Sequence, residues 1–347
     1  MMKEKLELWL RAAFQLRASD VHLTVGMPPV FRINGDLKKY GNEPLLPEDT
    51  YGIARSIIPS ESYETFKEKG ELDFSYGIKG VSRFRINTYH QRSCVSLAIR
   101  VIPTSIPTLE DLALPDTLKK MAAKPQGLIL VTGPTGSGKS TTQASIIDYM
   151  NRTMRRHIIT LEDPIEYLHR HNTCIIDQRE VGFDTANFAN GLRSSLRQDP
   201  DVILLGEMRD LETISTAITA AETGHLVLGT LHTSSAPSTI DRIIDVFPPN
   251  QQGQIRIQLA SVLVGILSQR LFPTPDKNGR KAVTEILLNN SAVANLVRNE
   301  KIHQIHNVMQ TSKASGMHTF EMSLKEALER QEILKESAEP YLQERSY

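Results

Sequence analysis

The chain has 347 residues, of which 40 are basic and 40 are acidic, so its formal net charge is zero. This balance speaks against a protein that coats nucleic acid or membranes through its overall charge, although a local basic groove is compatible with it. A content of 40% hydrophobic and 23% charged residues is typical of a globular protein and excludes a disordered, collagen-like or coiled-coil chain. The length accommodates two domains, each with a core of its own.

Neither a membrane span nor a secretion signal is apparent in the sequence. The longest nearly apolar stretch, residues 259–267, is too short to cross a bilayer, and charges are scattered through residues 1–17. We therefore expect a cytoplasmic protein without a transmembrane segment. The chain has two cysteines, Cys94 and Cys174, so a disulfide framework or a four-cysteine zinc module is excluded by count.

The first hundred residues predict a small α+β domain. Apolar residues recur at helical spacing over 6–14, a second helical pattern covers 47–69, and alternating strand patterns follow up to residue 101. Residues 102–108 contain two prolines within five positions, which is typical of a linker. We therefore predict an amino-terminal domain over 1–101, a linker and hinge over 102–108, and a second domain over 109–347.

The second domain has a different pattern. Its apolar runs 128–132, 158–161, 202–205 and 226–230 do not alternate, which indicates parallel strands that are buried on both faces. Helical patterns separate these runs, and strand–helix alternation predicts an α/β sheet covered by helices on both sides. After about residue 235 the pattern predicts mostly helices, with one strand at 282–288.

A phosphate-binding loop follows the first of these strands. Residues 133–140 fit the pattern G-x-x-x-x-G-K-[ST] at every position, between a strand and a helix as the motif requires. Backbone N–H groups of such a loop surround phosphate oxygens, Lys139 would reach the β- and γ-phosphates of ATP, and Ser140 would ligate Mg²⁺. The predicted nucleotide-binding residues are Gly133, Pro134, Thr135, Gly136, Ser137, Gly138, Lys139, Ser140 and Thr141.

Carboxylates follow two other strands. A nucleotide-hydrolysing site needs acids near the magnesium ion and near the attacking water. Glu207 follows the strand at 202–205 after Gly206, and Glu162 and Asp163 follow the strand at 158–161. The carboxyl ends of parallel strands share one edge of the sheet, where ligands bind. We predict Glu207 and Glu162 as catalytic residues and Asp163 as a magnesium ligand, without deciding which acid serves the water and which the metal.

One histidine and three arginines complete the candidate site. His232 lies at the carboxyl end of the strand at 226–231, where it would sense the γ-phosphate through a hydrogen bond to Glu207 or to a water. Arg83, Arg85 and Arg100 lie on strand patterns of the first domain. They are either solvated charges at a sheet edge or contacts to the nucleotide of a neighbouring subunit, as an arginine finger makes.

The chain resembles the hexameric ATPases of secretion systems and type IV pili over nearly its whole length. Five motifs occur in the family's order, namely its opening signature, its P-loop, its Asp box, its atypical Walker B and its His box. They lie at Ala18–Leu23, Gly133–Ser140, Thr160–Tyr167, Leu196–Asp210 and Gly224–Thr233.

The resemblance implies a homohexamer in which each subunit has a PAS-like amino-terminal domain and a RecA-like ATPase core, with ATP bound between the two. It implies that Glu207 positions or activates the attacking water and that Glu162 helps at the magnesium ion or at the water. Arg85 and Arg100 fit the spacing of two family arginines that reach nucleotide phosphates, and Arg83 is a weaker candidate for the same role.

Within this superfamily the chain is most similar to the pilus-retraction (PilT-like) branch. Extension and secretion motors commonly carry a four-cysteine zinc module and extra amino-terminal domains, for which the cysteine count and the length leave no room. Residues 292–299 align with a late helix of the retraction branch that reads AIRNLIRE, and depart from it at Ala294 and Asn299.

The resemblance therefore implies a Mg²⁺-dependent ATPase at the cytoplasmic face of the inner membrane. It would act on a membrane platform protein and, indirectly, on pilin, and it would power pilus retraction and twitching motility. Two alternatives stay open: an extension or secretion ATPase, and a non-hydrolysing, nucleotide-dependent scaffold that regulates such a motor. A nucleic-acid translocase is disfavoured by the zero net charge and by the lack of a basic, aromatic-rich stretch.

Overall fold

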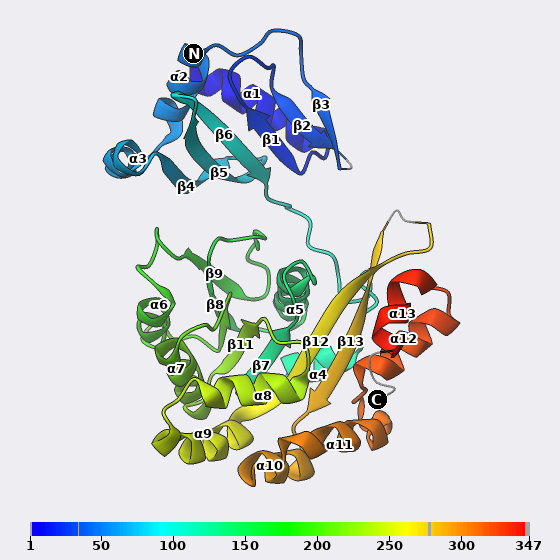
Figure 1. Ribbon diagram of the computed structural model, residues 1–347. Helices are drawn as coiled ribbons and strands as arrows, with labels where there is room; N and C mark the ends of the chain where they lie inside the picture. The colour runs from blue at the N-terminus through cyan, green and yellow to red at the C-terminus, as the bar shows by residue number, and fades with distance from the viewer. Residues whose placement is uncertain (1, 34, 277–278, 344–347) are drawn as a thin grey trace. The chain divides into compact units, whose positions relative to one another are not determined.

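The computed structural model describes residues 2–33, 35–276 and 279–343. The chain divides into two compact units, drawn in Figure 1. One ends at Ser105 and also includes Glu166–Leu168, and the other comprises Ile106–Ile165 and the chain from His169 onward. The division between Ser105 and Ile106 falls inside the proline-containing segment that we predict as the linker.

The amino-terminal unit is an α+β fold with one antiparallel sheet, whose strands lie in the order β3-β2-β1-β6-β5-β4. Its elements are α1 (Met2–Gln15), β1 (Asp20–Leu23), β2 (Val30–Ile33), β3 (Asp36–Lys39), α2 (Pro47–Ile57), α3 (Tyr63–Lys69), β4 (Glu71–Ile78), β5 (Ser82–Gln91) and β6 (Cys94–Val101). The core lies on one face of this sheet. Leu6 and Leu10 of α1 pack there with Ile53 of α2 against Phe84 and Ile99 of the strands.

The predicted helix over 47–69 is interrupted in the structure. Helix α2 ends at Ile57, a 3₁₀ turn follows at Ser60–Ser62, and α3 then begins at Tyr63. Pro59 explains the break, because the ring of a proline disfavours helical backbone at the residue before it. Ile58 accordingly has extended backbone, with φ −64° and ψ 127°.

The carboxy-terminal unit is built on a mixed sheet with the strand order β13-β12-β7-β11-β10-β8-β9. Its strands are β7 (Gly127–Thr132), β8 (His157–Glu162), β9 (Ile175–Glu180), β10 (Val202–Leu205), β11 (Leu226–Leu231), β12 (Leu263–Pro273) and β13 (Arg280–Leu288). Its helices are α4 (Thr117–Ala122), α5 (Lys139–Thr153), α6 (Phe188–Ser195), α7 (Leu211–Glu222), α8 (Ala236–Asp245), α9 (Pro249–Val262), α10 (Ser291–Arg298), α11 (Ile305–Thr311), α12 (Phe320–Glu329) and α13 (Lys335–Gln343).

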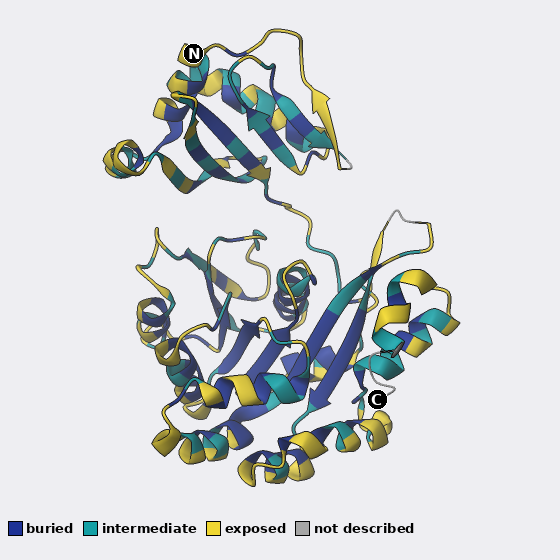
Figure 2. Ribbon diagram, in the orientation of Figure 1, coloured by how far each residue is buried: buried dark blue, intermediate teal, exposed yellow. Residues whose placement is uncertain are grey.

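Helices cover both faces of this sheet. Side chains of α4 and α5, such as Met121 and Ile147, pack with Ile129 on one face, and side chains of α6 to α11 pack with Leu130 and Ile203 on the other. Every residue of β7, β10 and β11 is buried, as the dark blue strands of Figure 2 show. The predicted fold class, an α/β core after a small α+β unit, is confirmed.

The prediction of mostly helical structure after residue 235 is wrong for one long strand. Strand β12 pairs in parallel with β7 and antiparallel with β13, so a hairpin extends the sheet where we expect a single strand at 282–288. The apolar stretch 259–267 is shared by the end of α9 and the start of β12. Periodicity does not distinguish a short apolar helix from a buried strand, which explains the error.

Candidate active site

The loop after β7 has a backbone that requires glycine. Gly133 has φ 146°, and a Cβ placed on it would lie 2.3 Å from the carbonyl oxygen of Gln269. Gly136 and Gly138 also have positive φ, at 77° and 88°. Such a run of turns directs successive N–H groups to one side of the loop, which is the arrangement that binds an anion.

The same loop has the donors that a bound phosphate requires. Helix α5 begins at Lys139, and its N-cap residue, Gly138, provides no side-chain cap for the first N–H groups. The hydroxyl of Ser137 is buried and has no hydrogen-bond partner among the residues that the structure describes. Lys139 Nζ donates to the carbonyl oxygens of Gly133 at 2.8 Å and Pro134 at 3.1 Å. These groups fit a nucleotide phosphate.

Gln269 on β12 supports this loop and was missed by the sequence analysis. Its side-chain amide donates to the carbonyl oxygen of Ser137 at 2.7 Å and accepts from the hydroxyl of Thr142 at 2.9 Å. The adjacent Ser268 is hydrogen-bonded to Thr132, at 2.8 Å between the two hydroxyl oxygens. In the sequence, Ser268 and Gln269 appear only as part of a short polar break, Ser268–Arg270, within an apolar run, and their partners lie more than a hundred positions away.

The segment after β10 presents Glu207 at the sheet edge because Met208 is fixed in the core. Met208 N donates to the carbonyl oxygen of Thr230 at 3.0 Å, and its side chain is buried over Gly229. A Cβ on Gly229 would lie only 2.3 Å from Met208 Sδ. Glu207 and Arg209 flank this buried methionine, and their side chains are 19% and 77% exposed.

Two side chains lie close to one carboxylate oxygen of Glu207. His232 Nε2 lies 2.9 Å from Oε1 of Glu207, and Arg209 Nε lies 2.5 Å from the same atom. Burial, the largest single effect, raises the pKa of Glu207, but Arg209 and His232 together outweigh it and lower the pKa below the ordinary glutamate value. Glu207 is therefore ionised at neutral pH, and its contact with His232 is the one that the sequence analysis anticipates.

The second acidic segment lies at the same edge of the sheet. Strands β8 and β10 are paired in parallel, and Gly206 N donates to the carbonyl oxygen of Leu161 at 2.8 Å. Glu162 Oε1 accepts hydrogen bonds from Thr160 Oγ1 at 2.6 Å and from Gln178 Nε2 at 3.1 Å. Asp163 is exposed at the edge.

A preformed metal site is not found at this edge. No group of three or more His, Cys, Asp or Glu side chains arranged to hold a metal ion occurs within residues 2–33, 35–276 and 279–343. Ser140 and Asp163, the predicted ligands, could therefore supply only part of a magnesium coordination shell. Mg²⁺ usually takes most of its ligands from water and substrate phosphates, so this sparse set fits the ion.

The three predicted arginines belong to the amino-terminal unit. Arg85 on β5 and Arg100 on β6 are cross-strand partners, so their side chains lie next to each other on one face of the sheet. Arg100 Nε is paired with Asp20 Oδ1 at 3.2 Å, and Arg85 Nε with Asp73 Oδ1 at 3.7 Å. Arg83 lies two residues before Arg85 on β5 and thus on the same face.

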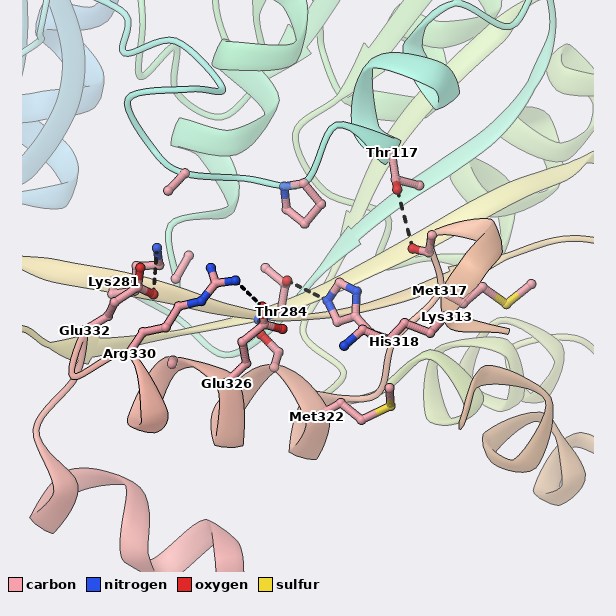
Figure 3. A pocket seen from close by; sticks show the side chains of 16 residues that line it. Thr117, Lys281, Thr284, Lys313, Met317, His318, Met322, Glu326, Arg330 and Glu332 are labelled. Atoms are coloured by element: carbon pink, nitrogen blue, oxygen red, sulfur yellow. Dashed lines mark hydrogen bonds and ion pairs between the residues drawn. The ribbon is translucent and has the colours of Figure 1, made fainter. Parts of the chain in front are cut away.

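A cavity of about 280 Å³ in the carboxy-terminal unit is lined by none of the predicted site residues. It lies between β13, α12 and residues 113–117 (Figure 3). Four of its charged side chains form two ion pairs, Lys281 with Glu332 at 3.0 Å and Arg330 with Glu326 at 2.6 Å. This cavity is therefore separate from the candidate active site.

Among the described residues, no helix has the length and apolar character that crossing a membrane demands.

Comparisons with known proteins agree with this geometry. Residues 3–339 match the family described as "Type II/IV secretion system protein". The chain is 45% identical to the type IV pilus retraction ATPase PilT of Pseudomonas aeruginosa, covering 92% of this chain and 93% of that protein. It is 42% identical to the type IV pilus ATPase PilU of the same organism, covering 96% and 87%.

A solved structure agrees as well. The crystal structure of the pilus retraction motor PilT with bound ADP superimposes with a TM-score of 0.89 and 50% identity, covering 95% of this chain and 94% of that one. A family match that includes both units, together with this fold, leaves one conclusion: the chain belongs to the type II/IV secretion system protein family.

Proposed function

We propose that this protein hydrolyses ATP and uses the energy to drive retraction of type IV pili. One observation carries the proposal: an ionised glutamate, Glu207, is held by His232 at the strand edge of a sheet that also presents a complete phosphate-binding loop. The relatives named as retraction proteins support the choice of pili as the structure acted upon.

Each predicted residue has a role in this proposal. The loop from Gly133 to Thr141 binds the phosphates, and Lys139 exchanges its contacts with Gly133 and Pro134 for phosphate oxygens. Glu207 orients the attacking water, and His232 links Glu207 to the γ-phosphate. A bound Mg²⁺ ion, held by Ser140 and either Asp163 or Glu162, supplies charge neutralisation at the phosphates.

The working form in this proposal is a ring of six identical subunits at the cytoplasmic face of the inner membrane. Arg85 and Arg100, with Arg83 beside them, contact the phosphates of a nucleotide in the ring, where they stabilise charge that develops during hydrolysis. Hydrolysis changes the angle between the two units of a subunit through the segment 102–108, and the ring turns a membrane platform protein that removes pilin. No contact with nucleic acid is part of this cycle.

Two measurements on matched variants test the proposal. Purified wild type should hydrolyse ATP in the presence of Mg²⁺ and should restore pilus retraction in a strain that lacks its own retraction ATPase. Lys139→Ala should abolish both activities and leave the melting temperature unchanged, because Lys139 contacts carbonyl oxygens of its own loop, which the bound phosphates would replace. Pili that extend but never retract in the complemented strain would favour an extension motor. A wild type that binds ATP without hydrolysing it would favour the scaffold.

A further inference from the structure

The contact between Arg209 and Glu207 is not explained by the roles assigned so far. Arg209 lies two residues after Glu207, and its side chain is 77% exposed while that of Glu207 is 19% exposed. An exposed arginine ordinarily gains little from an ion pair, since the pair is screened by water. Here Arg209 nevertheless lies over a half-buried acid, and Glu207 in turn is the main cause that raises the pKa of Arg209.

The geometry of the contact limits how the carboxylate can be oriented. Arg209 Nε and His232 Nε2 lie close to the same carboxylate oxygen, Oε1, at 2.5 Å and 2.9 Å. A carboxylate that is contacted by side chains from two different segments has less freedom to rotate than a carboxylate in open solvent.

We propose that Arg209 is a positioning residue for Glu207: together with His232 it holds the carboxylate in the orientation in which it accepts a hydrogen bond from the attacking water. This inference rests on the proposed ATPase function. The segment between the two residues supports it, because burial of Met208 against Gly229 fixes the backbone that carries both Glu207 and Arg209. Asp163, the other charged neighbour of Arg209, attracts the guanidinium toward the same edge.

The kinetic test compares Arg209→Gln and Arg209→Lys with wild type. Arg209→Gln should lower kcat by about ten- to a hundred-fold and leave KM for ATP within about two-fold, because it disorders a group that acts in the transition state. Arg209→Lys should recover only part of the rate, since an ammonium keeps the charge and loses the planar Nε donor. A raised KM with unchanged kcat would mean that Arg209 contacts ATP itself, and would overturn the proposal.

A thermal test without nucleotide separates positioning from a general structural role. Arg209→Gln should lower the melting temperature of the nucleotide-free protein by about 1–3 °C, as expected for loss of one partly exposed ion pair. In a Glu207→Gln background the same substitution should produce no further change. Equal shifts in both backgrounds would show that Arg209 does not act through Glu207.

A matched control comes from the cavity of Figure 3. Arg330→Gln removes a comparable exposed arginine from its pair with Glu326 on α12, and should leave kcat unchanged. If wild type hydrolyses no ATP, the proposed function fails, and the thermal cycle alone then decides whether Arg209 acts on Glu207.

Discussion

At the residue scale, the site depends on a carboxylate that is half-buried and yet charged. Burial alone would raise the pKa of Glu207 and favour its neutral form, but the contacts with Arg209 and His232 reverse the direction of the shift. The same pattern, an acid kept ionised in a partly dry site, is common where a side chain must accept a hydrogen bond from water during a reaction. In the proposed reaction, both the negative charge of Glu207 and the orientation of its carboxylate are important.

Replacement of Glu207 by glutamine tests the charge separately from the shape. Glu207→Gln keeps the size of the side chain and should keep ATP bound, but should slow hydrolysis by about two orders of magnitude or more. Single-turnover hydrolysis and nucleotide affinity, measured on the same preparation, check both parts. If wild type hydrolyses ATP no faster than the variant, the protein is a nucleotide-dependent scaffold.

A partly buried histidine, His169, predicts how stability depends on pH. Burial lowers the pKa of His169 from 6.5 to about 4, and its Nδ1 has no hydrogen-bond partner among the described residues. Below pH 6.5 the unfolded chain binds a proton at this histidine before the folded chain does, so acid favours unfolding. The free energy of unfolding should therefore fall by about 2 kcal/mol between about pH 6.5 and pH 5 because of this group.

The measurement is denaturant unfolding at several pH values for wild type and His169→Gln. The variant should lose less stability on acidification than wild type, and the difference should level off below about pH 4, where both states are protonated. Parallel curves for the two proteins would exclude His169 as a source of acid sensitivity.

At the scale of elements, helix α10 carries both buried residues that pack in the core and an exposed residue, Arg298, that is a candidate for coupling ATP hydrolysis to pilus retraction. Val293, Ala294 and Val297 are buried, Leu296 is only partly buried, and Arg298 is exposed at the end of the helix. Val293 and Val297 belong to the hydrophobic core, and Leu296 packs against it from the margin. The retraction branch has an arginine at the position of Ala294. Ala294 is buried here, so an arginine at this position would require different packing of the helix.

Two substitutions in α10 should therefore act differently. Arg298→Ala should preserve ATPase activity and the oligomeric state but stop pilus retraction in cells, if α10 transmits the motion. Val297→Ala should lower the free energy of unfolding by about 2 kcal/mol because it removes buried methyl groups. Melting curves, ATPase assays and retraction assays check both variants. Normal retraction with Arg298→Ala would remove α10 from the coupling pathway.

The elements differ in how well the sequence predicts them. Strands β7, β8, β10 and β11 are predictable because parallel strands buried on both faces appear as uninterrupted apolar runs between helices. The P-loop is predictable because its spacing is local. Strand β12 is not predictable, because its short apolar run fits a helix as well as a strand. The roles of Gln269 and Arg209 are not predictable either, because their contacts depend on the surrounding fold. The interruption of the helical pattern over 47–69 is also visible in the sequence, because Pro59 lies within it.

At the scale of the whole molecule, substitutions of Arg85 and Arg100 test whether the amino-terminal sheet contributes to catalysis in an assembled ring. Arg85→Ala and Arg100→Ala should lower turnover only in assembled rings, because in our proposal they act on a nucleotide within the ring. Mixing either variant with Glu207→Gln subunits should restore part of the activity, since each subunit supplies what the other lacks. Unchanged turnover in both arginine variants would make these residues ordinary surface charges that pair with Asp20 and Asp73.

Met208, which follows β10, packs directly over Gly229 of β11, so the packing of the two strands is interdependent at this point. The space that a side chain would occupy on β11 is filled by the thioether that follows β10. A methyl group added at Gly229 would displace Met208, and the displaced methionine would rotate the short segment that carries the acid and its arginine. We therefore expect the activity of the site to be sensitive to substitution of Gly229, the smallest residue of a neighbouring strand. A substitution in the core at Gly229 would therefore also move the segment that carries Glu207 and Arg209.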